Sequence, residues 1–212
     1  MKQKGIFISI EGPEGCGKTT QIRELAKYLS ESGKRVKVTR EPGGTSFTAK
    51  IRRVLLGDSK EDVSALSELF LYLSDRAQHV KNFIIPALKK GMVIITDRFS
   101  DSTYAYQGYG RGISMSLIKK LDKIATQGFK PDLTIIIDAE VKNGLRRAGK
   151  VKGRNDRLEK AGVKFHRKVR KGYLALAKKS PERIKLVKRQ PTVGKTQKII
   201  RNLVRKCLLK KS

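Results

Sequence analysis

A glycine-rich segment near the N-terminus has the residue types and spacing of a phosphate-binding loop. Residues 12–19 match the pattern GxxxxGK[ST]. Glycines let the backbone fold around a phosphate with its N–H groups pointing inward, and a helix that begins at the lysine adds the positive end of its dipole. The pattern therefore predicts a nucleoside triphosphate site formed by Gly12, Pro13, Glu14, Gly15, Cys16, Gly17, Lys18 and Thr19.

The side chains at the end of this loop have separate predicted roles. Lys18 would reach the β- and γ-phosphates, and the Thr19 hydroxyl would coordinate Mg²⁺. We interpret Cys16 as a small residue that fills space. The motif predicts a Mg²⁺–nucleotide site, but it leaves a kinase, a motor, a switch and a transporter open.

An Asp-Arg pair, Asp97-Arg98, follows the apolar run at residues 92–96. If that run is a strand of the same parallel sheet, both side chains lie at its carboxyl end beside the phosphate loop. There an aspartate can hold the water shell of Mg²⁺, and an arginine can form paired hydrogen bonds with a second phosphate. The segment at residues 39–45, TREPGGT, follows another apolar run and is either a plain turn or part of the same site.

An aromatic ring and a guanidinium come together on one predicted helix. Tyr72 and Arg76 are four residues apart and are therefore neighbours on the helix surface. Together they can clamp a planar base, although each alone is equally typical of an ordinary helix edge. We interpret His79, on the same stripe, as structural or solvated. Further polar contacts after the Asp-Arg pair are offered by Asp101, Ser102, Thr103, Tyr106 and Gln107.

Strand-like and helix-like segments alternate along the chain. Five short apolar runs are typical of buried parallel strands: residues 6–10, 36–39, 92–96, 133–137 and 184–187. Segments with apolar residues at helical spacing separate them: 18–32, 63–80, 114–126, 158–179 and 195–209. The alternation predicts an α/β fold, with one domain over residues 1–212 and a five-stranded parallel sheet flanked by helices.

The segment at residues 144–157 is rich in glycine and basic side chains. We interpret it as a short lid, because phosphoryl transfer requires positioning and charge stabilisation, and a closing lid also excludes water. A solvated basic loop is the alternative. Its basic residues are Arg146, Arg147, Lys150, Lys152, Arg154 and Arg157.

The chain is strongly basic, with 49 Lys and Arg against 19 Asp and Glu. Residues 1–138 carry a net charge of +8, whereas residues 139–212, with 26 basic and 4 acidic side chains, carry +22. Such a C-terminal third binds nucleotide phosphates, nucleic acid or simple counterions. Two distant cysteines exclude a disulfide framework and favour a reducing cytosol, and no apolar run approaches the ~18 residues of a membrane span.

Five segments, in order, resemble bacterial thymidylate kinases (dTMP kinases), which are P-loop enzymes of the nucleoside monophosphate kinase type. They are EGPEGCGKTTQ, TREPGGT, LYLSDRAQHV, TDRFSDSTYAYQGYGRG and PDLTIIIDAEVKNGLRR with GRNDRLE. The resemblance covers about residues 5–175 and leaves the basic C-terminus unexplained. It implies transfer of the γ-phosphoryl group of ATP to dTMP, giving dTDP and ADP for DNA precursor synthesis.

The resemblance also implies how dTMP is held. Arg98 would bind its phosphate, Tyr72 would stack on thymine where the family often has Phe, and Arg76 would bond the exocyclic oxygen of the base. Tyr106 would disfavour the extra hydroxyl of a ribonucleotide. The implied dTMP site consists of Tyr72, Arg76, Arg98, Thr103, Tyr106 and Gln107.

For the transfer itself, the resemblance places Glu14 near the reacting phosphates and Asp97 near Mg²⁺, the cofactor that accompanies ATP. Thymidylate kinases carry their catalytic arginine either in the P-loop or in the lid, and this P-loop contains none. Arg147 and Arg154 are therefore our candidates, while Arg157 could instead form an ion pair at a helix start. The residues predicted to act in catalysis are Lys18, Arg98, Glu14, Arg147 and Arg154.

The family further implies a homodimer built from apolar helix faces such as that of residues 63–80, and the cysteine usage leads us to expect a cytoplasmic protein. Three alternatives stay open at this point. One is a kinase for another monophosphate or a deoxynucleoside. Another is a nucleic-acid-binding P-loop ATPase, suggested by the charge, with residues 133–138 as its second nucleotide-binding strand. The last is a switch that binds nucleotide without turnover. The lid arginines are evidence against this alternative, because they have no role without phosphoryl transfer.

Overall fold

The computed structural model describes residues 5–57, 61–149, 157–158 and 161–211. Its centre is a five-stranded sheet in the order β2-β3-β1-β4-β5, with every described pair parallel. The strands are β1 (Ile6–Glu11), β2 (Val36–Arg40), β3 (Val93–Asp97), β4 (Leu133–Asp138) and β5 (Ile184–Lys188). Each of the five predicted strands is confirmed to within one residue at either end.

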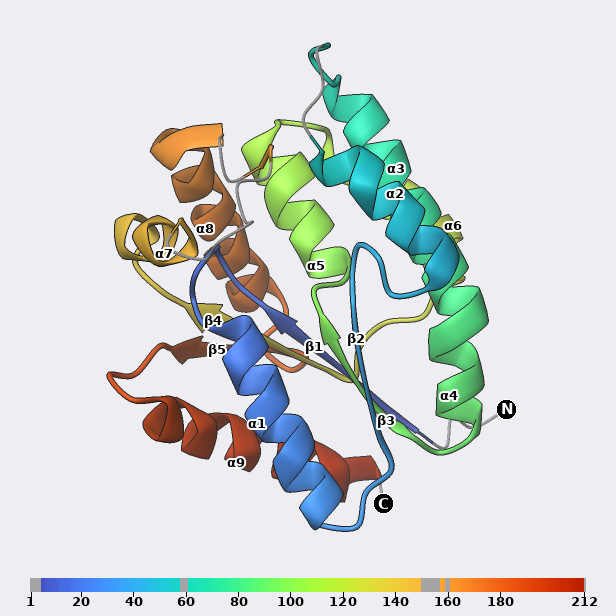
Figure 1. Cartoon of the computed structure of the whole chain (residues 1–212), viewed down its shortest axis with the longest axis vertical. Helices are drawn as coiled ribbons and strands as arrows, with labels where there is room; N and C mark the ends of the chain where they lie inside the picture. The colour runs from blue at the N-terminus through green and yellow to red at the C-terminus, as the bar shows by residue number, and fades with distance from the viewer. Residues whose placement is uncertain (1–4, 58–60, 150–156, 159–160, 212) are drawn as a thin grey trace.

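Alternate residues of the central strands face opposite sides of the sheet, because side chains in a strand alternate with a period of two. Ile8 and Ile10 of β1 pack into the cluster that contains α1 (Lys18–Glu31) and α9 (Val193–Lys211). Phe7, between them, packs on the other side with α4 (Ile85–Lys89), and Ile136 of β4 packs there with α8 (Gly162–Lys179). Figure 1 shows the resulting three layers, with α1 and α9 together on one face.

The long periodic helices are confirmed, but several helices were not predicted. Besides α1, α8 and α9, the predicted helices are α3 (Ala65–His79) and α6 (Met115–Thr126). The unpredicted ones are α2 (Ser46–Leu56), α4, α5 (Ser100–Thr103), α7 (Val141–Ala148) and two π-helical segments, η1 (Val80–Ile84) and η2 (Tyr104–Gly110). Most of these are short, and their contacts rather than their periodicity stabilise them.

The strand register brings the chemistry-bearing loops to one edge of the sheet. Asp97 lies beside Ile10 of β1 on one side and beside Arg40 of β2 on the other. The phosphate loop, the Asp-Arg pair and the loop after β2 therefore emerge together at the carboxyl ends of three neighbouring strands, where α/β sheets bind ligands. No helix within the described ranges is both long and apolar enough to cross a membrane.

Candidate active site

The glycines of the phosphate loop have backbone conformations that other residues rarely adopt. Gly12, Gly15 and Gly17 have φ angles of 136°, 64° and 101°. A Cβ on Gly15 would lie 2.0 Å from the carbonyl oxygen of Gly144, so this position has no room for a side chain. The Lys18 ammonium donates to the carbonyl oxygens of Gly12 (3.1 Å) and Pro13 (3.2 Å), which places it within the loop.

Helix α7 packs directly on this loop. A Cβ on Gly144 would lie 2.3 Å from the carbonyl oxygen of Glu14, and the Arg147 Nε donates to the carbonyl oxygen of Gly15 over 2.9 Å. The predicted lid therefore begins inside a helix whose backbone touches the phosphate loop, and it brings Arg147 to the cavity. Arg154, the other predicted lid arginine, lies outside the described residues.

Arg98 lies at the centre of a polar network between the phosphate loop and the opposite wall. Its φ of 75° is in the left-handed region, an uncommon conformation for arginine that recurs at functional sites. Its Nη1 donates to Gly12 O (3.3 Å), Ser102 Oγ (3.2 Å) and Tyr173 Oη (3.0 Å). Its Nη2 donates to Glu14 and to Tyr106 Oη (3.0 Å).

Glu14 is thus the ion-pair partner of Arg98. Burial alone would raise the pKa of Glu14, but the Arg98 guanidinium and then the Lys18 ammonium lower it to about 2. The Tyr106 hydroxyl also donates to the Glu14 carboxylate over 2.9 Å. Glu14 is therefore ionised at neutral pH, and it joins the donor loop to the arginine predicted to bind the acceptor.

The residues predicted to hold Mg²⁺ fit a metal ion that is bound mainly by phosphates and water. The Asp97 Oδ1 is buried and has no hydrogen-bond partner among the described residues, so one carboxylate oxygen is available as a ligand. Thr19 lies in the first turn of α1, and both residues line the same cavity. Within the described ranges no group of three acidic, His or Cys side chains could hold a metal by itself. This pattern is typical of Mg²⁺, which keeps several waters and substrate oxygens.

One cavity of about 1180 Å³ joins the two halves of the site. It extends from the phosphate loop, past Asp97 and Arg98, to the base-binding residues predicted on α3. The predicted dTMP residues Tyr72, Arg76, Thr103, Tyr106 and Gln107 all line it. The structure therefore brings together every described residue of the predicted acceptor site.

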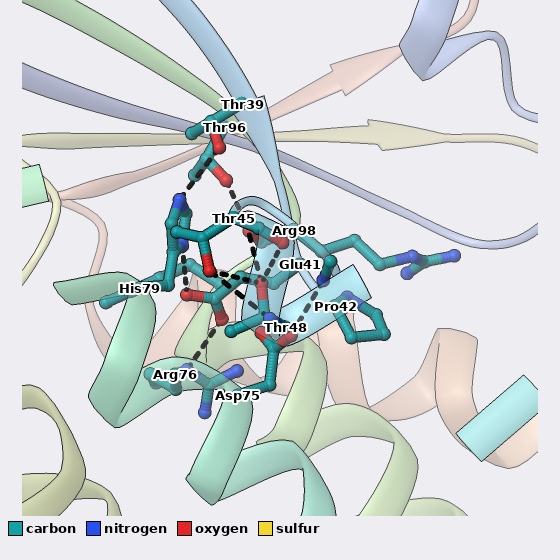
Figure 2. A network of polar contacts seen from close by, with 12 residues as sticks. Thr39, Glu41, Pro42, Thr45, Thr48, Asp75, Arg76, His79, Thr96 and Arg98 are labelled. Carbon is teal, nitrogen blue, oxygen red and sulfur yellow. Dashed lines mark hydrogen bonds and ion pairs between the residues drawn. The ribbon is translucent and has the colours of Figure 1, made fainter. Parts of the chain in front are cut away.

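Arg76 is fixed in this cavity wall by buried carboxylates. Its side chain is only 1% exposed, and it bonds Glu41 through Nε (2.8 Å) and Asp122 through Nη1 (2.9 Å). Figure 2 shows the Glu41 carboxylate between Arg76 and His79. The Arg76 Nη2 makes no hydrogen bond to any described residue, which leaves its two N–H groups for a ligand. His79 is buried between Glu41 and Thr39, so the structural interpretation of this histidine is confirmed.

Arg157 belongs to a second buried network rather than to the phosphate loop. Its Nη2 lies 2.6 Å from Glu68 of α3, whose other partners are Arg111 and Gln107. Hydrogen bonds from Arg111 and Gln107 lower the pKa of Glu68 although burial raises it. Glu68 thereby fixes Gln107 at the cavity wall. Asp156 and Glu159, the acidic neighbours of Arg157 in the sequence, lie outside the described residues.

Sequence reasoning missed two arginines of the cavity and most of the carboxylates behind it. Arg52 and Arg53 of α2 line the cavity, and the Arg52 Nη1 donates to the Pro42 carbonyl oxygen over 2.8 Å. Helix α2 was itself not predicted, so these residues were not placed near the site. The missed supporting carboxylates are Glu11, Glu41, Glu68, Asp75 and Asp122. An acidic residue at an otherwise apolar helix position, such as Glu68, is the signal that could have found them.

Asp75 supplies a pH-dependent test of this network. Burial and the neighbouring Glu41 carboxylate raise the pKa of Asp75 from 3.8 to about 7. Between these two pKa values the folded chain thus binds more protons than the unfolded chain. The free energy of unfolding therefore falls as the pH rises through this range. The loss is complete above about pH 7 and absent below the unfolded pKa. We expect Asp75→Asn to be more stable than the native chain by about 1–3 kcal/mol at pH 8.

The measurement is urea unfolding of both chains at pH 5 and pH 8. The stability difference should shrink markedly at pH 5, because Asp75 is then largely protonated. Asp62→Asn, at an exposed aspartate, is the matched control and should change stability little at either pH. An Asp75→Asn variant that is less stable at pH 8 would contradict the expectation.

The alternative of a nucleic-acid ATPase finds no support at the end of β4. Arg170 of α8 binds Asp138 through both carboxylate oxygens, at 2.6 and 2.7 Å. Asp138 is therefore occupied by an ion pair instead of facing the phosphate loop with a free carboxylate.

Fold and cavity together define a P-loop kinase of the nucleoside monophosphate kinase class, with a phosphate loop and a second arginine-lined pocket in one cavity. A family model described as thymidylate kinase matches residues 10–200. The chain belongs to the thymidylate kinase family.

Individual relatives agree with this assignment. The chain is 46% identical over 201 residues to a thymidylate kinase of Geotalea uraniireducens, covering 92% of this chain and 94% of that protein. It is 51% identical over 175 residues to one of Carboxydothermus hydrogenoformans, covering 82% and 85% of the two chains. A crystal structure of thymidylate kinase from Ehrlichia chaffeensis superposes with a TM-score of 0.78 at 33% identity, covering 95% of this chain and 98% of that one.

Proposed function

We propose that the protein transfers the γ-phosphoryl group of ATP to dTMP, giving dTDP and ADP. The observation that carries the proposal is the single cavity in which the phosphate loop and the Arg98 pocket face each other. Two phosphate-bearing molecules can lie in it end to end. Family membership supplies the identity of the acceptor.

On the donor side, the backbone N–H groups of the loop and Lys18 hold the β- and γ-phosphates of ATP. Thr19 and Asp97 would hold Mg²⁺, which neutralises the charge of the donor phosphates when it is bound. On the acceptor side, Arg98 holds the phosphate of dTMP. An oxygen of that phosphate is already anionic, so its attack on the γ-phosphorus needs no general base.

The charge that develops on the transferring group requires a cation that is not already neutralised. Arg98 is paired with Glu14, whereas Arg147 approaches the loop through a hydrogen bond to a backbone carbonyl. Arg147 is therefore our proposed catalytic arginine among the described residues, with Arg154 as the second candidate. Lys18 and Arg147 then approach the transferring group from the loop and from α7.

The function is tested by offering ATP with dTMP, dUMP, dCMP, AMP or thymidine and separating the products by chromatography. We expect dTDP formation with the highest kcat/KM for dTMP, loss of activity in EDTA and recovery with Mg²⁺. Failure of the purified protein to form dTDP under these conditions would contradict the proposal. If another acceptor gives the highest kcat/KM, the protein is still a kinase of this class, but its substrate is that acceptor and not dTMP.

Recognition of the base gives a prediction at Tyr72. The ring supplies stacking, which is worth about 1–3 kcal/mol per base, while no role for the hydroxyl is needed. Tyr72→Phe should therefore leave the KM for dTMP within about threefold, and Tyr72→Ala should raise it roughly tenfold or more. Steady-state kinetics of both variants at saturating ATP make the comparison. A similar loss in both variants would show that the hydroxyl, not the ring, contacts the substrate.

We also propose a cytoplasmic homodimer. Helices α2, α3 and α6 lie side by side on one flank of the molecule (Figure 1), and they expose large apolar side chains. These are Phe47, Val54, Leu66, Phe70, Leu117 and Ile124. Exposed apolar groups that gather on one flank are typical of a protein interface. Light scattering should give twice the chain mass of 23.8 kDa.

A further inference from the structure

Glu11, the last residue of β1, is a fully buried carboxylate that has no part in the roles described so far. It is 0% exposed and does not line the cavity. Four donors surround it. The Oε1 accepts from Ser9 Oγ (2.8 Å) and Phe99 N (2.7 Å), and the Oε2 accepts from Ser102 Oγ (2.6 Å) and Tyr173 Oη (3.1 Å).

Two of these donors also contact Arg98. Its Nη1 donates to Ser102 Oγ (3.2 Å) and to Tyr173 Oη (3.0 Å), and these two oxygens lie 2.8 Å apart. Two hydroxyls, those of Ser102 and Tyr173, therefore bridge Glu11 and the Arg98 guanidinium. These hydroxyls come from different elements, since Ser102 belongs to α5 and Tyr173 to α8.

The direction of the protons decides what these contacts do. An arginine can only donate, so Ser102 and Tyr173 must turn their lone pairs toward Nη1 and send their own protons elsewhere. The two hydroxyl oxygens lie close enough for one hydroxyl to donate to the other, but at least one of the two protons must go to the Glu11 carboxylate. A group at this position that accepted neither proton would leave one of them facing the guanidinium, and the Nη1 end would lose its anchor.

We propose that Glu11 is a positioning residue for substrate binding, which orients the Ser102 and Tyr173 hydroxyls so that they hold the Nη1 end of Arg98 in place for the phosphate of the acceptor nucleotide. The inference rests on the proposed function, in which Arg98 binds that phosphate. Glu14 and Tyr106 hold the Nη2 end from the cavity side. The guanidinium is thus fixed from both ends.

The burial of this carboxylate disfavours its ionised form. Burial, and next the nearby Asp101 carboxylate, raise the pKa of Glu11 to about 7. A raised pKa means that the fold disfavours the charged form, so ionised Glu11 lowers the stability of the folded chain at neutral pH and above. A role in holding Arg98 supplies a functional reason for keeping a carboxylate at this buried position.

The test is a double-mutant cycle between Glu11→Gln and Arg98→Lys, with dTMP affinity read by calorimetry and KM by steady-state kinetics. Glutamine keeps the shape but replaces one acceptor oxygen with a donor. We expect Glu11→Gln to weaken dTMP binding about tenfold and to leave the KM for ATP within twofold. In the Arg98→Lys background, the same change should weaken binding less than twofold, because the group it positions is gone.

Tyr173→Phe removes one bridging hydroxyl while keeping the ring, and it serves as the second arm if Glu11→Gln does not fold. It should weaken dTMP binding about three- to fivefold, again only when Arg98 is present. Ser9→Ala is the matched control, since it removes a donor from the Oε1 side that does not contact Arg98, and it should leave dTMP affinity within twofold.

Effects that are equal in the native and Arg98→Lys backgrounds would overturn the inference, and so would equal increases in the KM for dTMP and for ATP. A Ser9→Ala variant that binds dTMP as weakly as the Glu11→Gln variant would also overturn the inference. These outcomes are distinct from failure of the proposed function, which would be an unmodified protein that forms no dTDP at all.

Discussion

Replacing Arg98 with alanine should raise the KM for dTMP at least 100-fold and leave the KM for ATP within about threefold. Arg98 is placed to give an incoming phosphate charge-assisted hydrogen bonds, each worth about 1.5–3 kcal/mol, in a partly buried site. Two such bonds correspond to a factor of 10² or more in affinity. Steady-state kinetics with each substrate varied in turn measure both values.

A rise in the KM for dTMP without a similar rise in the KM for ATP distinguishes the proposed acceptor pocket from the ATP pocket. Arg98→Lys keeps the charge but loses the planar fork, so it should fall between the native chain and the alanine variant. Arg98→Ala also removes the cation that lowers the pKa of Glu14 against the effect of burial, so the KM for dTMP should be measured at pH 8 as well. An equal rise for dTMP and ATP would place Arg98 outside the acceptor pocket.

Replacing Arg147 with alanine should lower kcat about 10³-fold with little change in the binding of either substrate. An arginine that stabilises the transferring phosphoryl group acts mainly in the transition state, and such a group is worth about 10³–10⁵ in rate. Arg147 lines the cavity and is anchored 2.9 Å from the Gly15 carbonyl oxygen. Single-turnover kinetics at saturating substrates isolate the chemical step.

The neighbouring residue on α7 provides the control. Arg146 is exposed and does not line the cavity, so Arg146→Ala should reduce kcat less than threefold. Arg154→Ala, measured in the same way, decides between the two candidate lid arginines. Should Arg154→Ala lose 10³-fold while Arg147→Ala stays within tenfold, the catalytic role belongs to Arg154, and Arg147 serves only to dock α7 on the loop.

The buried supports of the site have a common pattern. Arg76 is held by Glu41 and Asp122, and Arg98 by Glu14. Each cation predicted to touch the acceptor nucleotide is thus held by a carboxylate before the ligand binds. Pre-orienting a charged donor in this way reduces the reorganisation needed when a substrate binds.

Much of the fold and the chemistry was determined by local sequence. The apolar runs indicated the five strands: the central strands β1, β3 and β4 are buried almost throughout, as parallel strands covered on both faces must be, whereas the edge strands β2 and β5 expose part of their residues. The GxxxxGK[ST] motif fixed the phosphate loop, because its glycines have φ angles that a side chain would strain. The place of Asp97-Arg98 followed from the end of a predicted strand, and four-residue spacing placed Tyr72 and Arg76 on one helix face, whereas their roles with dTMP came from the resemblance to thymidylate kinases.

What the sequence could not supply were contacts between segments far apart in the chain. Helix α2 brings Arg52 to the cavity, Gly144 meets the backbone of Glu14, and Glu68 fixes both Gln107 and Arg157. Short helices such as α5 and α7 are stabilised by these contacts and carry little periodic signal. A buried carboxylate such as Glu11 is chemically meaningful only through its partners, and the tertiary structure alone decides which hydroxyls and guanidinium lie beside it.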